Sequence, residues 1–556
     1  MEIPNYYERI GNPIEQEKKM KTKYSISFTI LMLFSLIGKA AEWQWSVEVK
    51  SVTSSETKDH PRAFLWIPPN CKQVRGVVVG QHNMLEEGIF EHKAFRKTLT
   101  DIGFAEIWVS PHISVVFDYK GEAEKAFNEM MESLADVSGY QELKFAPVIP
   151  MGHSALASYP WNFGALKPER TLAMISIHGD SPQTNMTGSG KPNPDWENRN
   201  IDGIPGLIVI GEYEWLEGRI IPGINYKKNH PKSTVALLAD AGRGHFDYSD
   251  EMVDFLGMFI KKAAKARLPE HMPLNTIAAL KPVNLNDGWL VDRWRLNEPL
   301  KASAAAYKNY KGNKDEAFWA FDKEMAKATE EYYNRARAKI PQYIGYLQQG
   351  KLLPGAGSFV GYRPVFKPQS DGLTFNVSAD FVDTVQGKSL TNNHAKGKIN
   401  ISRICGPVQK IDDTTFTVRF YRMGLNNPKR TGDIWLMASH PGDKKLKSVF
   451  QQANFRIPMK NETGVDQKID FPEIPEQKDG VESITLAATS TSGEPVYYYV
   501  KEGPAEVEGN NLKITTIPPR AKYPVKVTVV GWQWGRNIEP KLKSAEPVER
   551  SFYITK

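Results

Sequence analysis

The stretch that decides the fold reads Pro150-Met151-Gly152-His153-Ser154-Ala155-Leu156-Ala157. It follows the apolar run Ala146–Pro150, which predicts a buried strand, and it precedes a segment that favours a helix. A serine between a strand and a helix, flanked by small residues, is typical of a tight turn that pushes the hydroxyl out of the sheet. The small residues here are Gly152 and Ala155. The sequence therefore predicts an accessible, reactive hydroxyl at Ser154.

The segment around this turn, residues 42–268, alternates β-rich runs with helical patterns. Several runs are almost continuously apolar, as expected for strands buried on both faces. Helical periodicity appears in Glu122–Leu134 and in the segment after Asp250. The alternation predicts an α/β fold with a mostly parallel sheet and helices on both faces. The predicted strands are Gln44–Lys50, Arg62–Ile67, Gly76–Gly80, Ala105–Val109, Ala146–Pro150, Leu172–Ile177, Leu207–Ile210 and Val235–Leu238.

Two further polar positions follow predicted strands downstream of the serine. Ile204–Glu214 has the pattern of a late buried strand that ends in carboxylates, and Leu237–Ala241 leads into His245 just before the final amphipathic helix. Because the carboxyl ends of parallel strands meet at one edge of a sheet, we expect Ser154, an acid and His245 to lie close together.

With the Gly-x-Ser turn and the order serine, acid, histidine, residues 41–268 resemble the α/β-hydrolase superfamily of serine esterases. The chain departs from the family motif G-x-S-x-G at its last position, which is Leu156. The resemblance implies Ser154 as nucleophile, His245 as general base and a carboxylate that orients the imidazole. Glu214 fits the position of this acid best, and Glu212 and Asp240 are the alternatives.

The resemblance also implies an oxyanion hole. One donor is the backbone N–H of Ala155, and the other is the N–H of Asn83 or Met84 in the loop after the third strand. His82 in the same loop is assigned to substrate contact, with orientation of the loop as the alternative.

A polar insertion, Gly179–Gly203, precedes the acid-bearing strand, where this superfamily often inserts substrate-binding segments. It is rich in Asn, Pro and Gly and carries Trp196. A tryptophan among amides and acids suits stacking on a sugar ring, so Trp196 is assigned to substrate binding. A packed surface loop is the alternative.

The N-terminus has the order of a secretory signal. Lys21 and Lys23 precede the uncharged run Ile26–Ile37, and small residues follow at Gly38 and Ala40. The run is shorter than the ~20 residues of a membrane span, which disfavours an anchor. We therefore predict cleavage near Ala40, a secreted or periplasmic protein and no membrane span after signal removal.

Composition excludes several classes of protein. The formal charge of +7 is spread over 556 residues, without the dense basic stripe of a nucleic-acid-binding surface. The two cysteines, Cys71 and Cys405, exclude a disulfide framework, and no clustered Cys/His spacing predicts a metal or other cofactor.

The C-terminal half changes character twice. Lys314–Gln348 shows a helical pattern rich in aromatic residues, and from Ser358 onward short alternating runs with Gly, Asn, Asp and Pro between them predict β-sandwiches. The last part resembles bacterial immunoglobulin-like modules. We expect a signal segment at 1–40, the catalytic domain at 41–268, a helical linker at 269–357, a β-rich domain at 358–465 and an immunoglobulin-like sandwich at 466–556.

These patterns predict a secreted carboxylic-ester hydrolase acting on a complex carbohydrate. The carbohydrate substrate is an inference from architecture, because export and sandwich modules accompany polysaccharide-processing enzymes. A serine peptidase of the same fold is one alternative. A catalytically inactive, glycan-binding relative is the other, since Leu156 replaces the family glycine.

Overall fold

The computed structural model describes residues 43–118, 120–186, 191–296, 298–355, 361–385, 388–389, 394–420 and 427–556. The predicted signal segment, residues 1–40, lies outside the described residues. Within the described ranges, no helix combines the length and the apolar character that a membrane crossing requires.

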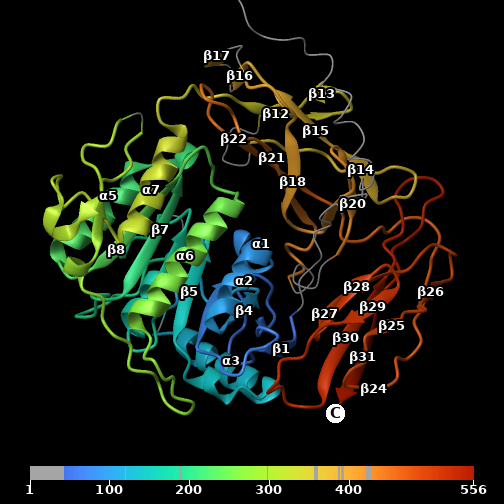
Figure 1. Ribbon diagram of the computed structural model, residues 1–556. Coiled ribbons are helices and arrows are strands. Elements are labelled where there is room, and N and C mark those ends of the chain that lie inside the picture. The colour runs from blue at the N-terminus through green and yellow to red at the C-terminus, as the bar shows by residue number, and fades with distance from the viewer. Residues whose placement is uncertain are drawn as a thin grey trace, which may run out of the picture. The chain divides into compact units, whose positions relative to one another are not determined.

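An eight-stranded sheet organises the N-terminal half (Figure 1). The strand order is β1-β2-β4-β3-β5-β6-β7-β8; β1 and β2 pair antiparallel, β2 and β4 do so as well, and the other strands are parallel. Each predicted strand matches one observed strand to within a few residues, and the predicted mostly parallel sheet is confirmed. The strands are β1 (Trp45–Glu48), β2 (Arg62–Trp66), β3 (Gly76–Gln81), β4 (Phe104–Ser110), β5 (Val148–His153), β6 (Met174–Ile177), β7 (Pro205–Gly211) and β8 (Thr234–Asp240).

Helices cover both faces of this sheet. In β4, Phe104 and Trp108 face one core cluster, whereas Ala105 and Ile107 face another, which follows from the alternation of side chains along a strand. The first face carries α1 (Leu85–Phe90), α2 (Lys93–Ile102), α6 (Asp250–Arg267) and α7 (Lys323–Ala336), and α2 lies beside α6 (Figure 1). The second carries α3 (Ala123–Ser138), α4 (Tyr159–Leu166) and α5 (Glu217–Asn229).

The region predicted as a helical linker is only partly helical. Within Lys314–Gln348 the helix is confined to α7, because the Asp322 carboxylate accepts the Met325 N–H at 3.0 Å and caps the helix there. The Tyr333 hydroxyl donates to the Leu237 carbonyl of β8 at 3.1 Å, so this region packs onto the eight-stranded sheet. Its strands are β9 (Trp289–Val291), β10 (Ala305–Ala306), β11 (Phe318–Ala320), β12 (Ile344–Gln348) and β13 (Lys351–Leu352).

Short, mainly antiparallel strands form the rest of the chain, as the β-rich prediction expects. The first group is β14 (Thr374–Asn376), β15 (Ser378–Phe381), β16 (Thr384–Val385), β17 (Lys388–Ser389), β18 (Asn400–Cys405), β19 (Val408–Lys410), β20 (Thr415–Val418), β21 (Asp433–His440) and β22 (Val449–Arg456). The second group is β23 (Ile469–Asp470), β24 (Gln477–Lys478), β25 (Ser483–Thr485), β26 (Thr489–Ser490), β27 (Tyr497–Glu502), β28 (Ala505–Glu508), β29 (Asn511–Ile514), β30 (Val525–Trp532) and β31 (Val548–Thr555).

The last segment, residues 466–556, packs against the eight-stranded sheet and α3. Its buried Phe471, Val500 and Leu512 belong to the same hydrophobic cluster as Val47 of β1 and Phe127 of α3. The Gly503 N–H also donates to the Trp43 carbonyl at 3.0 Å. This segment therefore completes a core that the N-terminal half begins. Its immunoglobulin-like character stays a prediction.

Candidate active site

Ser154 lies directly after β5, at the start of a 3-10 helix (Ser154–Leu156). Its φ of 52° places it in the left-handed region, which few residues other than glycine adopt. Gly152 is required by the tight turn, because a Cβ there would lie 2.1 Å from the Leu156 carbonyl oxygen. The Leu156 side chain is buried beside Val115 and Val116, so the departure from the family motif is accommodated by packing.

The structure brings the predicted serine, histidine and acid together. The Ser154 Oγ lies 2.7 Å from His245 Nε2, and His245 Nδ1 is hydrogen-bonded to Glu214 Oε2. Glu214 ends a 3-10 helix (Glu212–Glu214) that follows β7, and His245 lies in the loop between β8 and α6. The carboxylate of Glu212 instead accepts the Gly242 N–H at 2.8 Å and contacts Lys447 Nζ. Of the two glutamates, Glu214 is the one that contacts the imidazole.

The Glu214 carboxylate is fully surrounded by donors. Oε1 accepts His178 Nδ1 at 2.6 Å and the Gly211 N–H at 3.2 Å, and Oε2 accepts Arg219 Nη1 at 2.6 Å as well as His245 Nδ1. Burial by itself raises the pKa of this carboxyl, but the two histidines outweigh burial and hold its pKa well below the usual range. The carboxylate is therefore ionised, and it is the counter-charge that an imidazolium at His245 needs.

The predicted second oxyanion donors are occupied in this structure. The N–H groups of Asn83 and Met84 donate to Glu86 Oε2 at 3.4 and 2.9 Å, and Glu86 Oε1 accepts the His153 N–H at 2.8 Å. The prediction that one of these two amides is free for an oxyanion is therefore wrong for this conformation. The Ala155 N–H lies in the first turn of its 3-10 helix, where an amide has no partner within the helix.

The assignment of His82 to substrate contact also needs correction. The ring is buried on Trp108, with centroids 4.9 Å apart, and Nδ1 bonds Ser110 Oγ at 3.0 Å. Burial lowers the pKa of His82 well below its ordinary value. The side chain orients the loop after β3, which is the alternative that the sequence left open.

Trp196 does not form a stacking platform. The side chain is 3% exposed, its Nε1–H donates to Asn162 Oδ1 at 2.8 Å, and its ring packs edge-on against Tyr226. The assignment of Trp196 to sugar stacking is therefore wrong, because both faces of the ring lie in the core between α4 and α5.

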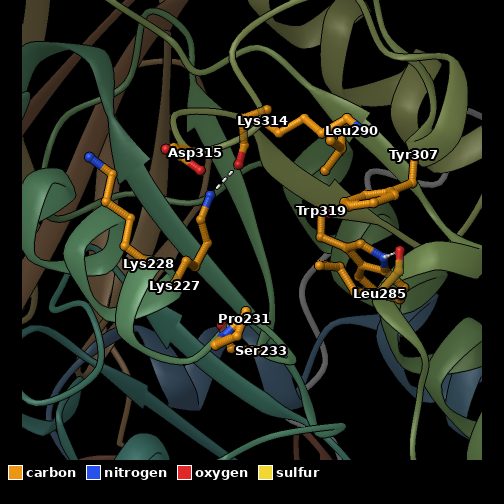
Figure 2. A pocket seen from close by; sticks show the side chains of 11 residues that line it. Lys227, Lys228, Pro231, Ser233, Leu285, Leu290, Tyr307, Lys314, Asp315 and Trp319 are labelled. Atoms are coloured by element: carbon orange, nitrogen blue, oxygen red, sulfur yellow. Dashed lines mark hydrogen bonds between the residues drawn. The ribbon is translucent and has the colours of Figure 1, made fainter.

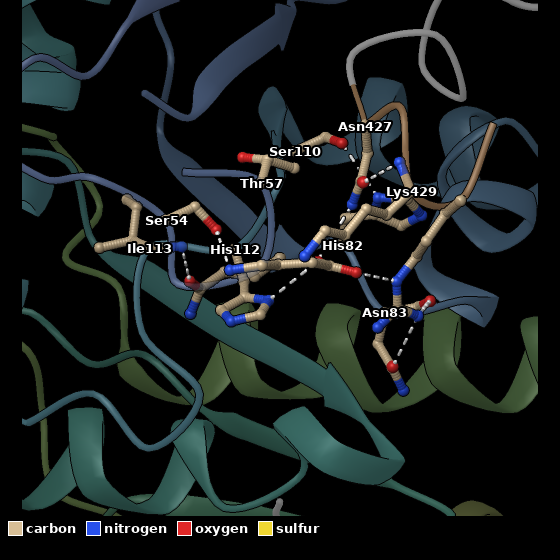
Figure 3. A network of polar contacts seen from close by, with 12 residues as sticks. Ser54, Thr57, His82, Asn83, Ser110, His112, Ile113, Asn427 and Lys429 are labelled. Carbon is tan, nitrogen blue, oxygen red and sulfur yellow. Dashed lines mark hydrogen bonds and ion pairs between the residues drawn. The ribbon is translucent and has the colours of Figure 1, made fainter. Parts of the chain in front are cut away.

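A polar network missed by the sequence reasoning ties the loop after β3 to the β-rich half (Figure 3). Asn83 Nδ2 donates to the His153 carbonyl at 2.9 Å, one peptide before the nucleophile. Arg430 Nη1 donates to the Asn83 carbonyl at 2.7 Å and pairs through Nε with Glu56. Glu56 lies 3.7 Å from His112 Nδ1. The β-rich half therefore contributes a side chain beside the nucleophile turn.

The β-rich half also supports the loop that carries His245. Gln452 Nε2 donates to Asp247 Oδ2, and the ring of Trp435 packs on Phe246 with centroids 4.7 Å apart. Both partners come from adjacent strands, β21 and β22. The local sequence around His245 does not predict these contacts, because Trp435 and Gln452 lie far along the chain from it.

One buried cluster among the described residues resembles a metal site. Ligand atoms of His178, Asp240 and Asp247 lie within 4.8 Å of one another. However, His178 Nδ1 bonds Glu214 at 2.6 Å and Nε2 bonds the Asp247 carbonyl at 3.1 Å. Both ring nitrogens of His178 are thus engaged with oxygen acceptors and are not available to a metal ion.

A separate pocket lies around Lys227, near the residues that lead into β8 and thus at the opposite edge of the sheet (Figure 2). Burial lowers the pKa of Lys227 to about 7, and its Nζ donates to the Ala317 carbonyl. The amino groups of Lys227, Lys228 and Lys314 point away from one another, so they do not converge on a ligand (Figure 2).

No protein-family model matches the chain, and no curated protein matches it. Among solved structures, the fluorophosphonate-binding serine hydrolase FphF of Staphylococcus aureus matches 40% of this chain and 98% of its own, at 10% identity and a TM-score of 0.28. Est1E from Butyrivibrio proteoclasticus matches 40% and 99%, at 13% identity and 0.26. An S-formylglutathione hydrolase from Agrobacterium tumefaciens matches 40% and 94%, at 12% identity and 0.29.

Proposed function

We propose that the chain is a serine hydrolase that cleaves carboxylic esters through Ser154. The observation that carries this proposal is the continuous contact from Ser154 Oγ to His245 Nε2, at 2.7 Å, and on to Glu214. The serine adopts a left-handed backbone at the end of a buried strand, which presents its hydroxyl at the edge of the sheet. This geometry favours an active enzyme over an inactive, glycan-binding relative.

The reaction proceeds by acyl transfer. His245 accepts the Ser154 proton as the oxygen attacks the ester carbonyl, and Glu214 stabilises the resulting imidazolium. The Ala155 N–H stabilises the negative oxygen of the tetrahedral intermediate. When the C–O bond breaks, His245 returns the proton to the leaving alcohol. Water then attacks the acyl-enzyme with His245 as base, which releases the acid and restores the Ser154 hydroxyl.

The direct test replaces Ser154 with alanine. We expect Ser154→Ala to abolish both hydrolysis of p-nitrophenyl acetate and labelling by a fluorophosphonate probe, with a thermal melt close to that of the parent. Ser303→Ala, at an exposed serine outside the site, is the matched control and keeps both activities. Retained hydrolysis in a folded Ser154→Ala protein would remove Ser154 as the nucleophile and refute the proposal.

For the substrate, we propose an ester on a complex carbohydrate. Two features support a carbohydrate substrate: the predicted export signal, and the β-rich half, which contacts the site through Arg430. Trp196 gives no support, because its side chain is buried. The test compares kcat/KM on acetylated or methyl-esterified oligosaccharides, on p-nitrophenyl esters of rising chain length and on peptide p-nitroanilides. A clear preference for the oligosaccharide supports the proposal. Rates that rise with acyl length indicate a lipid esterase, and turnover of the anilides indicates a peptidase.

Export is likewise proposed from the N-terminal pattern alone. Expression of the full chain with its natural N-terminus, followed by N-terminal sequencing of the protein recovered outside the cytoplasm, tests cleavage near Ala40. A retained, uncleaved N-terminus would contradict a signal peptide.

A further inference from the structure

Two buried histidines, His153 and His178, lie beside the triad histidine, His245, and their hydrogen-bond partners indicate which ring nitrogens carry protons. The ring centroid of His178 lies 6.1 Å from that of His245 and 5.9 Å from that of His153. His153 Nε2 faces the His245 carbonyl at 2.9 Å, and Nδ1 faces the amide nitrogen of Asn83 at 3.1 Å. One partner accepts and the other donates, so His153 is neutral with its proton on Nε2.

His178 has a different pair of partners. Nδ1 faces the Glu214 carboxylate at 2.6 Å, and Nε2 faces the Asp247 backbone carbonyl at 3.1 Å. Both partners are oxygens that only accept hydrogen bonds, so each ring nitrogen must carry a proton. A doubly protonated ring is an imidazolium cation. His178 therefore differs from His245, whose Nε2 must be free to accept the Ser154 proton.

The surroundings balance this charge. Acidic groups face His178 from three elements: Glu214 after β7, Asp240 at the end of β8 and Asp247 in the following loop. Asp240 Oδ2 and Asp247 Oδ1 are buried without a hydrogen bond among the described residues, so a nearby cation stabilises them. The basic groups are Arg219 on Glu214 and Arg243, whose Nη1 lies 3.8 Å from Asp247 Oδ1. Around His178 there are thus three acidic side chains and two arginines.

We propose that His178 is a fixed imidazolium that shares the Glu214 carboxylate with His245 and thereby weakens the attraction of this carboxylate for a protonated His245. This inference rests on the proposed serine-hydrolase function. Although burial opposes a charged ring, the adjacent Glu214 carboxylate raises the pKa of His178 above its ordinary value. His178 is a positioning residue, since it reaches the substrate only through Glu214 and His245.

The physical consequence follows from the three side chains that share the Glu214 carboxylate, namely His178, Arg219 and His245. A carboxylate already paired with His178 and Arg219 attracts the His245 imidazolium less strongly than an unshared one. Removing the His178 charge therefore strengthens the attraction between Glu214 and a protonated His245.

The kinetic test is the pH dependence of kcat/KM on p-nitrophenyl acetate for His178→Gln, which keeps an amide donor for Glu214 but not the charge. We expect the acid limb of the profile to move to higher pH, and the plateau to fall less than for a Glu214 variant. His178→Asn, which tolerates the left-handed φ of 48°, is the second variant. His230→Gln, at a histidine stacked on Tyr226, is the control and keeps the parent profile.

A second measurement, by NMR, uses the unmutated protein and so does not depend on whether a variant folds. In protein labelled with ¹⁵N-histidine, one of the eleven histidines should keep protons on both ring nitrogens to a higher pH than the other ten. A merely structural His178 would lower the plateau and leave the acid limb in place, which would overturn the proposal. If the NMR spectra show no such doubly protonated ring, the proposal is overturned as well. Activity in Ser154→Ala would refute the hydrolase assignment instead, while the NMR result would still decide the charge of His178.

Discussion

Replacing Glu214 with glutamine tests the centre of the site, because the two side chains differ by one charge and one acceptor. Four donors converge on the carboxylate: His178 and Gly211 on Oε1, and His245 and Arg219 on Oε2. The amide group of a glutamine would face two of these donors in either orientation. One pair of contacts is therefore lost whichever way the side chain turns.

The size of the effect follows from this arrangement. Loss of the triad carboxylate leaves the imidazolium without a counter-charge and typically lowers kcat by about 10⁴, or about 5.4 kcal/mol of transition-state stabilisation. Breaking one partner from a buried ion pair typically costs about 3–5 kcal/mol of folding free energy, and here the partners left behind are His178 and Arg219. Glu214→Gln should therefore lose both activity and thermal stability.

The assay measures kcat on p-nitrophenyl acetate and a thermal melt for the same samples, at a temperature where every variant is folded. Glu212→Gln is the matched control, since Glu212 contacts the Gly242 N–H and Lys447 rather than His245. It should keep kcat within about tenfold of the parent. A folded Glu214→Gln protein with kcat within tenfold of the parent, or a larger loss in Glu212→Gln, would refute the assignment of the acid.

Two further predictions concern the C-terminal half. Deleting residues 466–556 should abolish soluble expression, because it exposes the cluster that Phe471 and Leu512 share with α3; a soluble, active truncation would show that the catalytic half folds alone. Gln452→Leu should lower kcat about tenfold with little change in KM for a small ester, because Asp247 loses a donor and the His245 loop loosens. Steady-state kinetics measure this, and an unchanged kcat would mean that the loop holds its shape without β22.

Sequence reasoning located the sheet because its strands are buried on both faces. β4 and β7 are apolar at nearly every position, and such runs stand out against the polar segments between them. Ser154, Glu214 and His245 were predicted for a related reason, since each lies shortly after a strand at the same edge of the sheet, and the structure places the three side chains in contact. His178 carries the same signal at the end of β6, so attention to every polar residue at a strand end would have found it too.

The errors arise where a residue's role depends on neighbours that are distant in sequence. Trp196 lies in a polar stretch, but its ring is covered by Tyr226 and Asn162 from two helices. The loop amides of Asn83 and Met84 are consumed by Glu86, a carboxylate in the first turn of the next helix. The predicted helix across Lys314–Gln348 failed because periodic apolar residues do not reveal that Asp322 caps the helix partway along.

The contact between Gln452 and Asp247 spans 205 positions of the chain. During synthesis, Ser154, Glu214 and His245 leave the ribosome long before β22 does, so a nascent chain contains these three residues without the outer support of the histidine loop. The contact that supports this loop therefore forms only after β22 has been added.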